Sequence, residues 1–339
     1  MVPTMRWLVP TVLAVFVACA DPSSPESASH PRDLVPSQDR LRSHITALAA
    51  DTMCGRAAGT PYERSAGNYL RDRFVEYGLV PAAGEDFFQE FLLDQVGPAL
   101  AVANATTSAV LVCDSTYVGV SRNVLGALPG EGSLATQWVV LGAHYDHVGW
   151  RLFGDSALIF NGADDNASGT ALMLEIARLL SRFVNSHPTL SPRRSVLFSG
   201  YGAEEAGLVG SRFFTANPTI PLDSVVAMVN LDMVGRLREN QLIISGGYSA
   251  AQWPDLLEVL VPPNLGLVYD PSFSDRSDLF GFLQHGIPAV HFFTGLHDDY
   301  HAPTDDASEV NFDGMELVGR LAIPLLWELA TDAAPLGGS

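Results

Sequence analysis

Apolar runs and helically spaced apolar residues alternate along most of this chain. The stretches 136–144, 194–201 and 223–235 are short and almost continuously apolar, which is typical of buried strands. Residues 169–183 and 206–217 instead place apolar residues three and four positions apart, which predicts helices. Strands that are apolar throughout are covered on both faces, so the pattern predicts an α/β fold. We expect a three-layer sandwich with a largely parallel, mixed central sheet flanked by helices.

The flanking stretches extend this pattern. Residues 63–80 have helical spacing and contain Gly78 near the end, as helix C-termini commonly do. Residues 87–93 and 99–113 indicate strands, the second broken near Asn104. There is no internal repeat and no interior linker. We therefore expect one domain over residues 37–332, followed by a C-terminal tail at 333–339.

The N-terminal residues are predicted to lie outside this domain. Arg6 precedes an apolar stretch that ends at Ala18 and is too short for an ordinary membrane-spanning helix, which is the layout of a secretory signal peptide over residues 1–18. Val17-Ala18-Cys19 resembles the lipobox of bacterial lipoproteins, so we expect lipidation of Cys19, with plain secretion as the alternative. Residues 19–36 are rich in Pro, Ser and Ala and predict a tether. The expected location is the cell envelope, as a periplasmic or outer-membrane lipoprotein, or outside the cell.

Composition narrows the classes of partner. The formal net charge of −19 disfavours nucleic acid and anionic membrane surfaces, because binding to phosphates needs clustered Lys and Arg. Membrane contact is expected only through the lipid anchor. Two cysteines remain after Cys19, and an oxidising compartment permits a disulfide between Cys54 and Cys113. Two buried free thiols are the equal alternative.

Acids and histidines gather in five short stretches, most of them directly after an apolar run. They are LGAHYDHVG, FNGADDNASG, SGYGAEEAG, NLDMVG and HDDYHAPTDD, which contain His144, Asp146, Asp165, Glu204, Glu205, Asp232, Tyr300 and His301. Ligands in open α/β sheets bind at the carboxyl ends of strands, and three predicted strands deliver such residues to that edge. Nitrogen and oxygen donors in this number suit a pair of zinc-like divalent ions with a base alongside.

These stretches resemble the M28 family of co-catalytic zinc peptidases, of the bacterial secreted aminopeptidase type. The family's H-x-D motif, G-A-x-D-[DN]-x-S-G stretch, E-E pair, strand-end Asp and late His occur here in the same order. The resemblance implies two zinc ions per chain that share one aspartate, held by His144, Asp165 and Asp232 and by Asp165, Glu205 and His301.

The resemblance also assigns roles to the remaining residues. It implies that Glu204 is the general base acting on a metal-bridging hydroxide, that Asp146 orients His144, and that Tyr300 donates a hydrogen bond to the developing oxyanion. The implied protein is an exported di-zinc exopeptidase, a metallo-aminopeptidase that hydrolyses the N-terminal peptide bond of peptides. Leu279 stands where many relatives have His, so the relatives' side-chain specificity does not transfer.

Three neighbours of these residues are not counted as ligands. Asp164 is interpreted as a loop residue, because alignment on Asn166 favours Asp165 as the shared aspartate. His147 lies beside the proposed ligands and is set apart from them, and His297 is interpreted as a residue at the rim of the site or behind the ligands. The alternative functions are a zinc carboxypeptidase or dipeptidase, one-zinc acyl transfer of the glutaminyl-cyclase type, and a non-catalytic surface binding protein on a peptidase scaffold.

Overall fold

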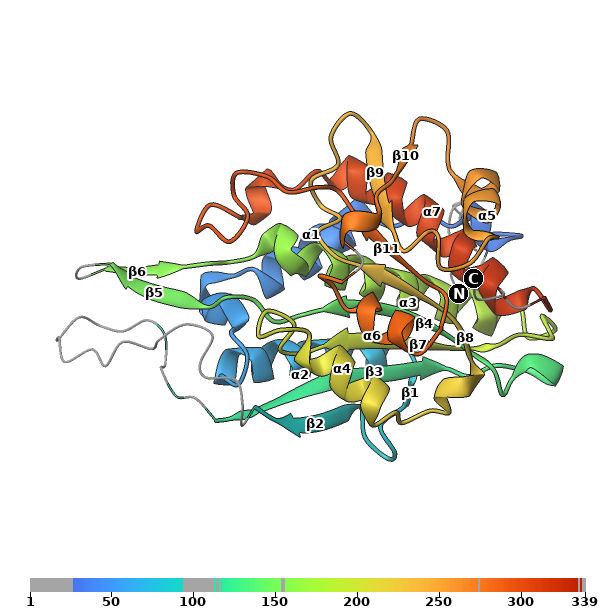
Figure 1. The fold of residues 1–339 in the computed structure, drawn as a ribbon, viewed down its shortest axis with the longest axis horizontal. Helices are drawn as coiled ribbons and strands as arrows, with labels where there is room; N and C mark the ends of the chain where they lie inside the picture. The colour runs from blue at the N-terminus through green and yellow to red at the C-terminus, as the bar shows by residue number, and fades with distance from the viewer. Residues whose placement is uncertain are drawn as a thin grey trace, which may run out of the picture.

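A computed structural model describes residues 27–93, 113, 116, 118–153, 156–273, 275–334 and 336 (Figure 1). The predicted signal peptide at 1–18, Cys19 and most of the predicted strand at 99–113 lie outside these residues. Among the residues described, there is no helix with the length and apolar character needed to cross a membrane.

In the described part of the chain, nine strands form one sheet in the order β1-β3-β7-β4-β8-β11-β9-β10, with β2 also paired to β3. Their bounds are β1 (Val80–Pro81), β2 (Phe88–Leu92), β3 (Val120–Leu128), β4 (Trp138–His144), β7 (Ser195–Tyr201), β8 (Val225–Leu231), β9 (Gln241–Ser245), β10 (Gly266–Tyr269) and β11 (Ala289–Phe293). The central strands β7, β4, β8 and β11 are parallel. Antiparallel pairs join β3 to β7 and β11 to β9, so the sheet is mixed.

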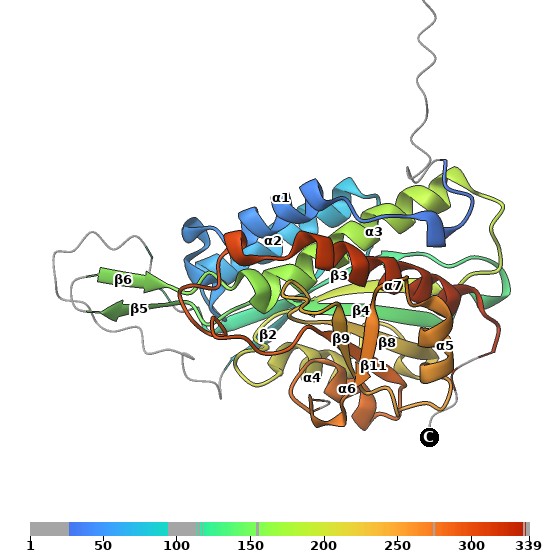
Figure 2. The same ribbon diagram turned by 90° about the horizontal axis from the view of Figure 1, so that it is seen from above.

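Helices cover both faces of this sheet (Figure 2). The α-helices are α1 (Gln38–Leu48), α2 (Pro61–Glu76), α3 (Gly169–Ser186), α4 (Val209–Ala216), α5 (Trp253–Leu260), α6 (Leu279–Gln284) and α7 (Phe312–Thr331). Helices α1, α2, α3 and α7 lie on one side and α4 and α6 on the other. Strand alternation supplies both cores, because Val139 and Leu141 of β4 join the cluster under α3 and α7 whereas Val140 joins the cluster under α4 and α6. The predicted three-layer α/β fold is confirmed.

The predicted tether differs from the structure over its last part. The side chains of Ala28 and Leu34 are buried in the main core, beside the short helix η1 (Pro31–Asp33). Arg32 forms an ion pair of 2.9 Å with Glu328 of α7, and the backbone N–H of Ser37 donates to Glu175 of α3. The composition of residues 19–36 is polar and Pro-rich, but Ala28 and Leu34 in this segment pack in the core. The folded unit therefore begins before residue 37.

The structure also contains a separate β-hairpin and a disulfide. Strands β5 (Trp150–Phe153) and β6 (Ser156–Ile159) pair in a separate hairpin, which projects from the body of the molecule (Figure 1). A disulfide joins Cys54, in the short helix η2 (Asp51–Arg56), to Cys113. Of the two alternatives for these cysteines, the structure therefore has the disulfide.

Candidate metal centre

Three parallel strands end at one edge of the sheet and deliver acids and histidines there. Strand β4 ends at His144, which is in register with Tyr201 at the end of β7. Strand β8 pairs with β4 on the other side and is followed directly by Asp232. Glu204 and Glu205 follow the end of β7. This is the edge at which α/β sheets bind their ligands.

Asp165 reaches the same edge from the turn η4 (Ala163–Ser168), which precedes α3. The next residue anchors this turn: Asn166 donates to the carbonyl of Leu231 and accepts from the backbone N–H of Met233 and of Gly169. The hydroxyl of Thr170 donates to the carbonyl of His144. Hydrogen bonds therefore tie the Asp165 turn to the end of β8 and the start of α3 to the end of β4.

One group of donors consists of His144, Asp165 and Asp232. Nε2 of His144 lies 3.3 Å from Oδ1 of Asp165 and 3.3 Å from Oδ1 of Asp232. All three side chains are buried. Ser277 donates to the other oxygen of Asp232, which holds this carboxylate in one orientation.

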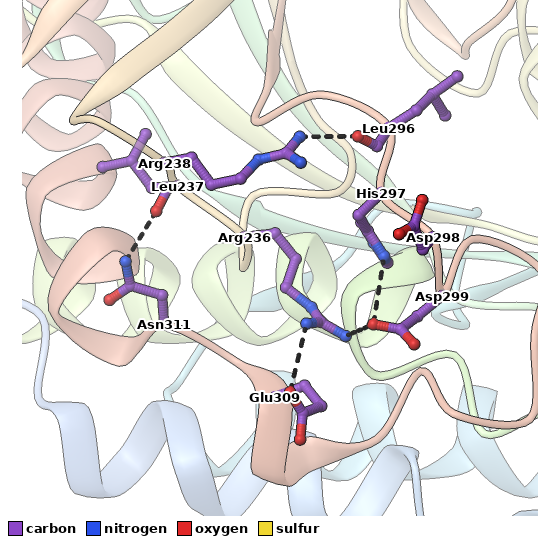
Figure 3. Close-up of a pocket in the computed structure, with 9 residues that line it drawn as sticks. All are labelled: Arg236, Leu237, Arg238, Leu296, His297, Asp298, Asp299, Glu309 and Asn311. Atoms are coloured by element: carbon purple, nitrogen blue, oxygen red, sulfur yellow. Dashed lines mark hydrogen bonds and ion pairs between the residues drawn. The ribbon is translucent and has the colours of Figure 1, made fainter.

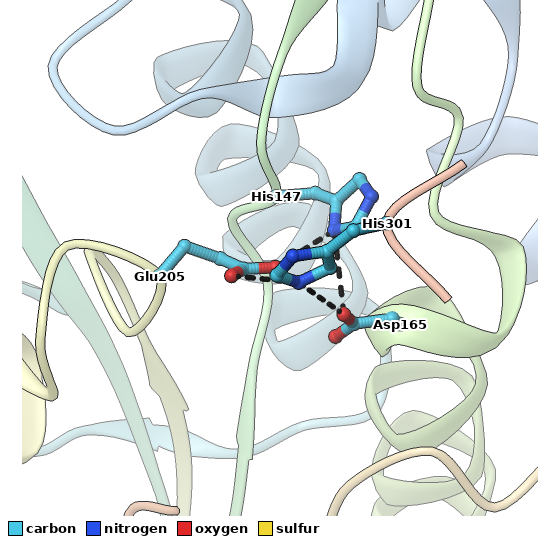
Figure 4. A group of neighbouring side chains, drawn as sticks. All are labelled: His147, Asp165, Glu205 and His301. Carbon is cyan, nitrogen blue, oxygen red and sulfur yellow. Dashed lines mark hydrogen bonds and ion pairs between the residues drawn. The ribbon is translucent and has the colours of Figure 1, made fainter. Parts of the chain in front are cut away.

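A second group consists of His147, Asp165, Glu205 and His301 (Figure 4). Nε2 of His301 lies 3.1 Å from Oδ2 of Asp165 and 3.1 Å from Oε1 of Glu205. Nδ1 of His147 lies 2.9 Å from that same Glu205 oxygen. Asp165 therefore directs one carboxylate oxygen to each group and is the residue that the two groups share.

These donors fit zinc in chemistry and in spacing. Zinc takes His nitrogen and carboxylate oxygen at about 2.0–2.2 Å, so neighbouring donors of a tetrahedral site lie about 3.3 Å apart. The distances from histidine nitrogens to carboxylate oxygens within the two groups run from 2.9 to 3.7 Å, and all donor atoms of a group lie within 4.8 Å of one another. Three carboxylates facing two dications leave one positive charge, which is a sensible balance for a buried site.

The pKa shifts of His301 and Glu204 indicate an excess of negative charge at the site. Burial opposes protonation of His301, but hydrogen bonds to Asp165 and Glu205 outweigh it and raise the pKa of His301 to about 10. Burial raises the pKa of the Glu204 carboxyl well above its usual range, and although the charge of His144 opposes this shift, the charge of Glu205 adds to it. Acids outnumber the basic groups at this edge, which favours bound cations.

Asp146 contacts the Glu204–Glu205 turn more closely than it contacts His144. Its oxygens accept from the backbone N–H of Glu204 at 3.0 Å and of Glu205 at 3.3 Å. The distance from its Oδ1 to Nδ1 of His144 is 3.7 Å, which is longer than a hydrogen bond. The predicted role of Asp146 in orienting His144 therefore rests on this longer contact alone. Its hydrogen bonds instead position the backbone of Glu204 and Glu205.

Asp164 belongs to neither group of donors. One of its oxygens accepts from Ser168 and from the backbone N–H of Gly235, and the other lies 3.1 Å from Nε2 of His297. His297 thus contacts the neighbour of the shared aspartate and lies outside both groups. This geometry matches the interpretation of Asp164 as a loop residue and of His297 as a residue behind the ligands.

Tyr300 lines a small cavity beside the first group. The cavity has a volume of about 120 Å³, and Asp232, Met233, Phe293 and Tyr300 are among the residues that line it. The Tyr300 ring stacks on His301 with 3.9 Å between ring centroids. Burial and the nearby carboxylates raise the pKa of Tyr300, so its hydroxyl keeps its proton and can donate.

A larger cavity of about 540 Å³ has His297 among its lining residues (Figure 3). Its charged side chains contact one another: Arg236 lies 2.9 Å from Asp299 and 3.8 Å from Glu309. None of its lining residues belongs to either donor group. We therefore assign the chemistry to the smaller cavity, which shares Asp232 with the first group.

Three residues at this edge have unusual backbone angles. Ala203, Met233 and His301 have φ values of 56°, 52° and 51°, in the left-handed region that residues other than glycine rarely adopt. Each is a member of the site or adjoins one, since Ala203 precedes Glu204 and Met233 follows Asp232. Strained backbone of this kind concentrates at functional sites.

The sequence interpretation missed His147. The stretch HYDHV contains it, but the direction of a side chain beyond a strand end depends on the turn that follows. In the structure β4 ends at His144, and the buried ring of His147 faces Asp165 and Glu205. The available signal was its position directly after Asp146, within the same acid and histidine stretch.

Comparison with known proteins points to one family. The sequence model of peptidase family M28 matches residues 123–326, which include both donor groups. The chain is 39% identical over 114 residues to mouse aminopeptidase NAALADL1, which covers 33% of this chain and 14% of that protein. It is 27% identical over 253 residues to leucine aminopeptidase 1 of Uncinocarpus reesii, which covers 71% of this chain and 62% of that enzyme. Both matches span less than two thirds of the relative.

Solved structures share the fold. A zinc aminopeptidase from Bacillus subtilis superposes with a TM-score of 0.65 at 18% identity, over 89% of this chain and 98% of that one. The LapA aminopeptidase of Legionella pneumophila superposes with a TM-score of 0.62 at 21% identity, over 88% of this chain and 73% of that one. The arrangement of strands and helices is therefore one that zinc aminopeptidases use.

Proposed function

Because this chain belongs to peptidase family M28, we propose that it is a zinc-dependent aminopeptidase that binds two zinc ions. The observation that carries the proposal is the pair of donor groups that share Asp165, one of them buried in all three members. The names of the relatives support the same activity, since the mouse, fungal and bacterial proteins are all described as aminopeptidases. The proposed substrate is the N-terminal peptide bond of a peptide.

The donor groups divide the proposed ligands between two positions. His144, Asp165 and Asp232 would hold one zinc ion, and Asp165, Glu205 and His301 the other. When bound, such ions polarise the carbonyl of the substrate and lower the pKa of a water molecule that they hold.

Proton transfer falls to Glu204. Its carboxyl is not a member of either donor group, and burial and neighbouring acids raise its pKa, which suits a group that must take up a proton and release it. Glu204 takes a proton from the attacking water and passes it to the leaving amine. Asp146 fixes the turn that carries Glu204, and the hydroxyl of Tyr300 donates to the carbonyl oxygen as negative charge develops there.

We also propose that the protein is exported and anchored by a lipid on Cys19. The basis is the sequence alone: Arg6, the apolar stretch that ends at Ala18, and the cysteine that follows it. Radiolabelled fatty acid should be incorporated into the wild-type protein and not into Cys19→Ser when the full chain is expressed in a bacterial host. Equal labelling of both proteins would contradict the anchor.

Peptides with free and blocked ends test the activity. We expect cleavage of peptides with a free amino terminus, whether or not the carboxyl terminus is amidated, and no cleavage after acetylation of the amino terminus. Treatment with a chelator should abolish cleavage and added zinc should restore it. A requirement for a free carboxyl terminus would instead indicate a carboxypeptidase, and cleavage that survives complete metal removal would contradict the proposal.

The Glu204→Gln variant tests the mechanism. It should bind zinc like the wild type and lose at least about 100-fold in kcat, because the amide cannot accept the proton. Glu258→Gln changes an exposed glutamate on α5 in the same way and should leave zinc content and kcat unchanged. An unchanged kcat in Glu204→Gln would exclude this residue as the base.

A further inference from the structure

The two donor groups differ in the number of protein ligands that they offer. The group around Asp232 has three members, whereas the group around Glu205 has four, because His147 joins it. Three protein ligands leave a fourth position of a tetrahedral zinc site open, as in catalytic zinc sites, and four close it, as in structural ones. The extra histidine therefore bears on how firmly each position holds its metal.

The ring of His147 packs closely against Gly162. Gly162 lies against it with a φ of 59°, and a Cβ at Gly162 would come within 2.5 Å of Cγ and Cδ2 of the ring. Only glycine suits both this backbone angle and this close contact. The imidazole therefore rests directly on the backbone of the turn that carries Asp165.

The backbone around His147 is fixed as well. Its N–H donates to the carbonyl of Arg56 at 3.3 Å. The fully buried guanidinium of Arg56 donates to the carbonyls of Tyr145, two residues before His147, and of Gly162, against which the ring packs. A side chain whose backbone and ring are both fixed in this way is preorganised for a ligand, which lowers the entropy that binding must remove.

The ring presents Nδ1 to the point where the other donors meet. Nδ1 lies 2.9 Å from Oε1 of Glu205 and 3.7 Å from Oδ2 of Asp165. The His147 and His301 rings approach edge to face, with 5.5 Å between their centroids. Within the described residues Nε2 of His147 is buried and has no hydrogen-bond partner. All the contacts that the ring makes with polar groups are therefore on its Nδ1 side.

We propose that His147 supplies, through Nδ1, a fourth protein ligand to the metal position of Asp165, Glu205 and His301. The inference rests on the proposed zinc-dependent function and deepens it. The four-ligand position keeps its zinc ion, and the position of His144, Asp165 and Asp232 exchanges its ion more readily and retains the open coordination site. The alternative is that His147 only donates a hydrogen bond to Glu205.

Stepwise removal of zinc measures the proposed difference in affinity between the two metal positions. Zinc-loaded protein dialysed against increasing concentrations of a chelator should pass through a stage with one zinc per chain before it loses both. In His147→Ala the stage with one zinc per chain should disappear, because the zinc affinity of the position of Asp165, Glu205 and His301 should fall by at least about 100-fold. Replacing residues that only support metal ligands lowers metal affinity by about 10- to 100-fold. His285→Ala, which removes an exposed histidine directly after α6, should behave like the wild type.

Cobalt separates a ligand from a hydrogen-bond donor. In the cobalt-loaded protein, His147→Ala should change the visible absorption of one ion, and added imidazole should restore it. His147→Cys should retain the tight position and acquire a sulfur-to-cobalt charge-transfer band, which arises only if residue 147 touches the metal. An unchanged cobalt spectrum in the alanine variant, or no such band in the cysteine variant, would overturn the proposal in favour of hydrogen bonding to Glu205.

The outcomes distinguish this inference from the proposed function. Wild-type protein that binds no zinc would defeat both. Wild-type protein that cleaves peptides with two equally exchangeable zinc ions would defeat only the role of His147. His144→Ala supplies the reciprocal variant, since it should weaken the exchangeable position and leave one tightly held zinc ion in place.

Discussion

Glu63 provides a quantitative test of the electrostatics beneath the site. This glutamate of α2 is 2% exposed, and its carboxyl accepts from the backbone N–H of Gly59 and from the hydroxyl of Ser121. It lies under the turn that leads to Glu204, because a Cβ placed on Gly202 would come within 2.7 Å of its Oε1. Burial, with a smaller contribution from Asp146, raises the pKa of Glu63 from 4.5 to about 8.

The sign of the resulting pH dependence follows from proton binding. Between pH 4.5 and about 8, the folded protein keeps a proton on Glu63 that the unfolded chain has released. Stability therefore falls as the pH rises through this window and changes no further above it. At about 1.4 kcal/mol for each pKa unit, the difference between 4.5 and about 8 corresponds to a loss of roughly 5 kcal/mol.

Glu63→Gln removes this titration and keeps the shape of the side chain. We expect the free energy of unfolding of the variant, relative to the wild type, to rise by about 1.4 kcal/mol per pH unit within the window. Urea unfolding of both proteins from pH 5 to pH 9, in the presence of a chelator, measures this difference. The chelator prevents zinc binding from adding its own pH dependence.

Glu258→Gln is the matched control, because it replaces an exposed carboxylate on α5. Its stability relative to the wild type should vary little over the same range. If the difference between Glu63→Gln and the wild type also stayed constant from pH 5 to pH 9, Glu63 would be ionised in the folded protein. The reasoning from burial would then be refuted.

Three further predictions concern the support of the site. Arg56→Met leaves several buried carbonyls without a donor and should lower the free energy of unfolding by at least about 3 kcal/mol, as measured by urea unfolding. Tyr300→Phe should lower kcat by about 100-fold or more and leave zinc content unchanged, and an unaltered kcat would remove the hydroxyl from the mechanism. Cys54→Ser opens a disulfide between residues 59 positions apart and should cost about 4 kcal/mol, so a variant as stable as the wild type would contradict the disulfide's contribution.

The parts of the site that lie on strand ends were predictable from sequence. Strand direction determines which end carries the ligand, and the apolar runs before His144 and Asp232 identified both strands and their ends. Parallel pairing of β4 with β8 then brings the two residues to one edge without further information. Periodicity and sheet geometry were sufficient there.

Residues beyond the regular elements were not predictable in the same way. The ring of His147 faces Glu205 and packs against Gly162, which lies outside its own stretch of sequence. Leu34 lies in a Pro- and Ser-rich segment whose composition predicts a tether, yet it packs in the main core. In both cases the contact that places the residue is with a different segment of the chain. Local sequence patterns therefore do not predict it.

The buried acids at this edge divide into those that the protein itself satisfies and those that it does not. Asp305 accepts from the backbone N–H of Asp164 and Asp165, and Asp146 accepts from the N–H groups of the glutamate turn, so these two carboxylates have donors of their own. Within the described residues, the side-chain oxygens of Glu205 and Asp165 form ion pairs only with histidine side chains. A buried carboxylate that faces only imidazoles, which are themselves metal ligands, is stable when a cation lies between them. This difference in hydrogen bonding, more than the number of acids, separates the proposed ligands from the acids that position them.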